Sequence, residues 1–187
     1  MGAPLGIPRR PISVSEYHKM GEAGVLSEND RVELIEGELI QMSPIGGPHI
    51  QLVNLLVRTL DRQLGDDGIV SVQNPVALPP DSEPEPDIVV LRPECLYRTE
   101  VPNAADVLLI VEVSHSTLAY DRDVKIPLYA KHGIPEVWIF EASNRSLSIY
   151  REPARNSYRR LLTPDRSETI SPSLLPKVQL RLRDVWR

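Results

Sequence analysis

The chain has 187 residues, of which 41% are hydrophobic and 25% are charged, and its formal net charge is −5. These values are ordinary for a globular protein, and the acidic balance argues against a protein that coats nucleic acid without specificity. No apolar run reaches about 18 residues, so no membrane span is expected. A single cysteine, Cys95, excludes an internal disulfide and indicates a reducing cytoplasm.

The length predicts one domain with a single sizeable core. We place this domain at residues 12–187, after a flexible tail of residues 1–11 that is rich in Pro and Gly. Charge is uneven along the chain, because residues 1–150 carry 12 Lys and Arg against 22 Asp and Glu, whereas residues 151–187 carry 9 against 4. The basic segment is most simply a set of arginines that solvate exposed strands, although it could face phosphate groups locally.

The N-terminal part predicts a short helix followed by a β-hairpin. Ser13 and Glu16 have the spacing of a capping box, which indicates a helix that begins here and ends near Ala23. Residues 31–42 alternate between apolar and polar on both sides of Glu36-Gly37. We therefore expect a hairpin in which the glycine supplies a positive φ at the turn.

The middle of the chain predicts a long helix and several strands. Residues 49–64 have apolar side chains at spacings of three and four, which is the pattern of a helix that faces a core. Residues 69–73 and 75–78 predict an antiparallel pair. Two apolar runs at 87–91 and 107–113 then predict buried or half-buried strands, separated by a loop of about fifteen residues.

The C-terminal part predicts another helix and a series of short strands. The helix is expected to end at His132, before Gly133, and Pro127 indicates a kink or a late start within it. Short strands are expected at residues 134–140, 147–150, 158–162 and 178–182. The order of these elements predicts an α/β fold with a mixed central sheet and helices packed on it.

Each of the two apolar runs in the middle of the chain carries one acidic residue, Asp87 in the first and Glu112 in the second. A carboxylate inside such a run is costly unless something pairs with it. If the strands are neighbours, two charges about 4 Å apart repel by about 4 kcal/mol at an effective dielectric of 20. A divalent cation would remove that repulsion, and Lys125 in the next helix could orient a water and offset phosphate charge.

At this point the chain resembles a bacterial family of restriction-endonuclease-like proteins, long catalogued as a domain of unknown function, within the PD-(D/E)xK nuclease superfamily. The resemblance covers about residues 12–182. It rests on the segments Val32–Leu39, Glu85–Asp87, Ile110–Ser114, Asp121 with Lys125, Leu128–Ala130 and Gly133–Ile139. Together these motifs are specific, whereas a lone Pro-Asp with a distant acidic residue is weak.

The resemblance implies a restriction-endonuclease-like core, a mixed sheet flanked by helices, with the site at one edge. By matching position, Asp87 and Glu112 would be metal ligands for Mg²⁺ or Mn²⁺, and the backbone carbonyl of Val113 would be a third. Glu33, from the N-terminal hairpin, would correspond to the acidic residue that often completes the site. DNA would be the substrate, and a homodimer is expected because cutting both strands of a duplex asks for two sites.

One position departs from the motif, because the signature places a lysine at position 114 and this chain has Ser114. Lys125 is the candidate replacement, although an ion pair with Asp121, four residues earlier, also explains that lysine. Glu33 could instead be a solvent-facing hairpin residue. His49 is most simply a polar residue at a helix start.

These observations support three functional hypotheses. The first is a divalent-metal-dependent DNA endonuclease in which Asp87, Glu112 and Lys125 act at the scissile phosphate. The second is a non-catalytic module that keeps a nuclease fold to bind nucleic acid or protein, and Ser114 motivates it. The third is a metal-dependent hydrolase of another phosphate ester.

Overall fold

The computed structural model describes residues 9–27 and 29–186. The first eight residues of the expected N-terminal tail therefore lie outside the described residues. The chain forms two compact units, one made of Met1–Met42 with Ala77–Pro84 and the other of Ser43–Val76 with Glu85–Arg187. The expectation of one domain over residues 12–187 stays a prediction.

The first unit contains the expected short helix and hairpin. Helix α1 (Val14–Glu22) begins with a complete capping box, in which Ser13 and Glu16 bind each other's backbone N–H groups. Strands β1 (Val32–Ile35) and β2 (Glu38–Gln41) pair in antiparallel fashion around a turn. Gly37 adopts a φ of 78° in that turn, which explains the glycine.

The second unit is built on a six-stranded sheet in the order β3-β4-β5-β6-β7-β8. Strands β5 and β6 are parallel, and the other neighbours are antiparallel. The six strands are β3 (Ile69–Val72), β4 (Ile88–Leu91), β5 (Val107–Ser114), β6 (Glu136–Glu141), β7 (Ser146–Ala154) and β8 (Ser157–Leu162). This mixed sheet with flanking helices confirms the predicted fold class.

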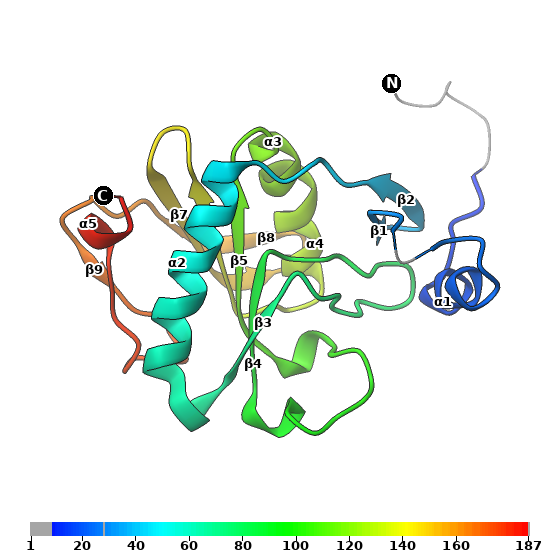
Figure 1. Cartoon of the computed structure of the whole chain (residues 1–187), viewed down its shortest axis with the longest axis horizontal. Coiled ribbons are helices and arrows are strands. Elements are labelled where there is room, and N and C mark those ends of the chain that lie inside the picture. The colour runs from blue at the N-terminus through cyan, green and yellow to red at the C-terminus, as the bar shows by residue number, and fades with distance from the viewer. Residues whose placement is uncertain (1–8, 28, 187) are drawn as a thin grey trace. The chain divides into compact units, whose positions relative to one another are not determined.

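Two helical layers cover this sheet (Figure 1). Helix α2 (Gly47–Leu64) turns Leu52, Leu56 and Leu60 into the core that contains alternate residues of β4 and β5. On the other face lies a continuous helical segment that contacts β5, β7 and β8. It consists of α3 (Leu118–Tyr120), a π-helical turn η4 (Asp121–Lys125) and α4 (Ile126–Lys131).

The chain also forms short elements around this framework. Three 3₁₀ turns, η1 (Gly65–Asp67), η2 (Pro93–Cys95) and η3 (Ala104–Asp106), connect its strands and helices. Strands β9 (Thr169–Ile170) and β10 (Leu180–Arg181) pair with each other, and α5 (Leu182–Val185) follows. None of the described helices combines the length and the apolar character needed to cross a membrane.

One predicted strand pairing is wrong, and one expected strand is shorter than predicted. Strand β3 pairs with β4 and not with residues 75–78, where Leu78 makes only an isolated bridge to Ser82. Pro75 opens that segment, and Pro79 and Pro80 follow it directly, so the N–H groups that a ladder needs are missing there. The strand expected at residues 178–182 is only the two-residue β10 before α5. Val178, Leu180 and Leu182 are buried, so the alternation of apolar residues here reflects burial and not a long strand.

Candidate active site

The pairing of β4 with β5 brings two acidic side chains together at one end of the sheet. Ile88 lies opposite Val111, so Asp87, just before β4, is placed beside Glu112. The Val113 N–H donates a 2.8 Å hydrogen bond to Asp87 Oδ2, and the Asp87 N–H lies 3.4 Å from Glu112 Oε2. Each carboxylate therefore binds the backbone of the other strand, which fixes the two groups relative to each other.

Glu112 is almost fully buried, with 2% of its surface exposed. The Tyr129 hydroxyl donates to Glu112 Oε1 at 2.6 Å, and Lys125 Nζ lies 3.3 Å from the same oxygen. Burial raises the pKa of Glu112 to about 8, against the lowering effects of Lys125 and the Tyr129 hydroxyl, and with further increases from Asp121 and Asp87. A bound cation would oppose this increase in pKa, because it would stabilise the ionised carboxylate.

Lys125 reaches this acid pair from the π-helical turn η4, which ends at that residue. Its side chain is only 6% exposed, and Nζ lies 5.8 Å from the centroid of the Tyr120 ring. The lysine is therefore buried, and it interacts electrostatically with Asp121 four residues earlier as well as with Glu112. The amino group stands beside Glu112 although position 114 holds a serine.

Ser114 and Asp121 form a second buried contact next to Glu112. Ser114 Oγ donates to Asp121 Oδ2 at 2.6 Å, and Thr117 Oγ1 donates to the same oxygen at 2.9 Å. Burial raises the pKa of the Asp121 carboxyl, whereas Lys125 and the two hydroxyls lower it. Ser114 thus occupies the motif's lysine position with a hydrogen bond to the helix that carries the replacement lysine.

His49 joins the site from the first turn of α2. Its Nε2 lies 2.8 Å from Asp87 Oδ1, and the two side chains are 14% and 17% exposed. The sequence favoured a plain helix-start residue here, and the structure adds its contact with Asp87, so a functional role for His49 stays a prediction. Tyr129 was not predicted to contact the acids, although it follows Asp121 and Lys125 at the same spacing of four.

Val113 and Glu33 are the two remaining candidate metal ligands. Val113 lies in the site through its backbone, and the metal-binding role of its carbonyl stays a prediction. Glu33 lies on β1 in the first unit and is 2% exposed, so it is not a solvent-facing hairpin residue. Its role as a ligand also stays a prediction.

The donor set at the end of β4 and β5 suits a hard divalent cation. Among the described residues, no group of three or more His, Cys, Asp and Glu side chains is arranged to hold a metal ion. Magnesium, however, commonly uses one or two carboxylates and completes its coordination with waters and phosphate oxygens. The carboxylates of Asp87 and Glu112, with the backbone carbonyl of Val113, meet that requirement. Burial raises the pKa of Glu112, and a nearby positive charge would stabilise its ionised form.

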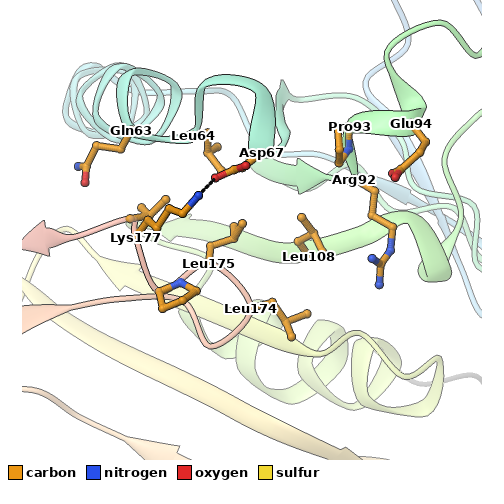
Figure 2. A pocket seen from close by; sticks show the side chains of 12 residues that line it. Gln63, Leu64, Asp67, Arg92, Pro93, Glu94, Leu108, Leu174, Leu175 and Lys177 are labelled. Carbon is orange, nitrogen blue, oxygen red and sulfur yellow. Dashed lines mark hydrogen bonds and ion pairs between the residues drawn. The ribbon is translucent and has the colours of Figure 1, made fainter.

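A hollow of about 360 Å³ lies elsewhere in the second unit, and Figure 2 shows the side chains that line it. Its floor is apolar and includes Leu64, Leu108 and Leu175, and Lys177 Nζ pairs with Asp67 Oδ2 at 2.9 Å on one side. Arg92 from this hollow follows β4, whereas Asp87 precedes it, so the hollow is not part of the acid pair's site.

Comparison with known proteins agrees with this architecture. A family model described as "Putative restriction endonuclease" (Uma2) matches residues 14–183. A crystal structure described as a "putative nuclease belonging to DUF820" from Anabaena variabilis superposes with a TM-score of 0.73 at 19% identity. The superposition covers 94% of this chain and 98% of that one. No curated protein matches the chain.

The family model matches most of the chain, from the N-terminal helix to the last helix. The model spans the hairpin, both strands of the acid pair and the helix that carries Lys125. The structural neighbour shares the fold of this chain. The chain therefore belongs to the restriction-endonuclease-like family that this model describes.

Proposed function

We propose that this protein is a divalent-metal-dependent endonuclease that hydrolyses phosphodiester bonds in DNA. One observation carries the proposal: Lys125 Nζ lies 3.3 Å from Glu112, which in turn contacts the backbone of Asp87. The two acids and the amino group of the motif are thus together, although the lysine comes from another element. Family membership supports a nuclease, and the metal and the DNA substrate are the further steps that we propose.

Asp87 and Glu112, with the Val113 carbonyl, would hold Mg²⁺ or Mn²⁺. A cation at that position would lower the pKa of a water and offset the charge that develops on the phosphate. His49 orients the Asp87 carboxylate through Oδ1, while the Val113 N–H fixes Oδ2. Glu112 would have to be ionised to act as a ligand, so binding of a cation would be coupled to the release of its proton.

Lys125 has two functions in this proposal. Its amino group binds the attacking water beside Glu112, and its positive charge stabilises the phosphate oxygens in the transition state. The hydroxyl of Tyr129 keeps Glu112 Oε1 directed towards this amino group. We further propose that two copies form a dimer to cut both strands.

The experiment is cleavage of a supercoiled plasmid with Mg²⁺ or Mn²⁺ by the wild type, Asp87→Asn and Glu112→Gln. Each change removes one ligand charge while the side chain keeps its shape. We expect wild-type cleavage that needs the cation and rates at least about 100-fold lower for both variants, which is the scale of losses for electrostatic catalytic groups. Glu94→Gln is a matched control, because Glu94 is exposed and lies beyond the opposite end of β4.

Equal cleavage by the wild type and Glu112→Gln would refute the proposal, because the activity would then come from a contaminant or another site. Calorimetric titration with Mn²⁺ separates the remaining alternative. No heat of binding together with no cleavage would favour the non-catalytic binding module, which Ser114 originally motivated.

A further inference from the structure

The helical segment next to β5 directs three side chains to one face. Asp121, Lys125 and Tyr129 are spaced by four residues, and all three interact with the face of β5 that carries Glu112 and Ser114. In a regular α-helix two steps of four residues drift by about 80° around the axis. The turn from Asp121 to Lys125 is π-helical, and its wider winding opposes this drift.

Strand β5 presents matching groups to these side chains. Glu112 and Ser114 are two residues apart, so they lie on the same face of the strand. Glu112 meets Lys125 and Tyr129, while Ser114 meets Asp121 at 2.6 Å. Ser114 is 0% exposed and Asp121 is 5% exposed, so this hydrogen bond lies in the interior.

We propose that Asp121, anchored by Ser114, is a positioning residue that sets the place of the Lys125 amino group at Glu112. The serine at the motif's lysine position is then part of the catalytic arrangement. Its short side chain leaves room for Asp121 and binds it, and Asp121 attracts the lysine one turn later. This inference rests on the proposed nuclease function and adds to it a residue that acts through Lys125.

Asp123 provides an internal comparison for this role. It lies in the same π-helical turn, carries the same charge and is exposed, and it pairs with Arg122 at 2.7 Å. A general effect of acidic residues on this turn would make Asp121 and Asp123 equivalent. A positioning effect requires only Asp121, because only Asp121 faces Ser114 and interacts electrostatically with Lys125.

The first test is a double-mutant cycle on kcat for plasmid cleavage at saturating Mn²⁺. We expect Asp121→Asn to lower kcat by about 10–100-fold with little change in KM, since a small misplacement of a catalytic group has effects of this size. In a Lys125→Met background the same change should have no further effect. An equal loss in both backgrounds, or no loss from Asp121→Asn, would overturn the inference. Asp123→Asn should leave kcat unchanged.

The second test does not need activity and uses crystal structures of the metal-free variants. In Asp121→Asn, Lys125 Nζ should move from 3.3 Å to beyond hydrogen-bonding distance of Glu112 Oε1, whereas Asp123→Asn should keep it in place. An unmoved amino group in Asp121→Asn overturns the inference. Ser114→Ala, which removes only one hydroxyl, replaces Asp121→Asn if that variant does not fold. Absence of cleavage by the wild type would refute the proposed function alone, because these structures would still decide the role of Asp121.

Discussion

The buried carboxyl of Glu112 makes the stability of the metal-free protein depend on pH, and Glu112→Gln should remove that dependence. The folded-state pKa of about 8 lies above the ordinary value of 4.5 because burial penalises the charge. A group of this kind contributes stability that is fully present below pH 4.5 and is lost as the pH rises through 8. Glutamine has the shape of the protonated acid and does not titrate in this range.

The magnitude follows from the size of the shift. Each pKa unit corresponds to about 1.4 kcal/mol, so the wild type should lose about 3–5 kcal/mol of this contribution between pH 4.5 and pH 8. Chemical denaturation of both proteins in the presence of a chelator measures the free energy of unfolding at each pH. As the pH rises, we expect the free energy of unfolding of the wild type to fall by this amount relative to that of Glu112→Gln. Parallel pH profiles for the two proteins would refute the reasoning.

Further changes test other parts of the structure. His49→Ala should weaken Mn²⁺ binding by about 10–100-fold in calorimetry, because it frees Asp87 Oδ1, and His49→Gln should lose less. Glu136→Ala should destabilise the fold by about 3–5 kcal/mol in denaturation experiments, because it leaves Arg151 without its buried partner. Unchanged values in any of these measurements would contradict the corresponding contact.

The sequence predicted the acid pair because its signal is local. Asp87 and Glu112 each interrupt an apolar run, and a buried charge needs a partner or a metal. The hairpin, the long helix and the strands around these acids were also correct, since their periodicity and capping residues lie within a few positions of each other. Lys125 was predicted from its place in the helical segment that follows the second acid, and the structure adds that it is buried beside Glu112.

The sequence did not reveal contacts that depend on how distant elements pack. His49 lies 38 positions before Asp87, and nothing in the local pattern connects the two. Arg151 belongs to the basic segment that was expected to solvate exposed strands, yet it binds the buried Glu136. Such pairings are properties of the folded sheet and its layers, so charge counts along the chain cannot predict them.

The central claim is that Asp87 and Glu112 hold one divalent cation at the edge of the sheet where β4 begins and β5 ends. Anomalous diffraction from crystals soaked in Mn²⁺ tests it most directly. The account predicts a single strong peak within bonding distance of a carboxylate oxygen from each residue, and no peak there in Glu112→Gln crystals. A wild-type crystal with no peak at this position, or with manganese bound only elsewhere, would contradict it.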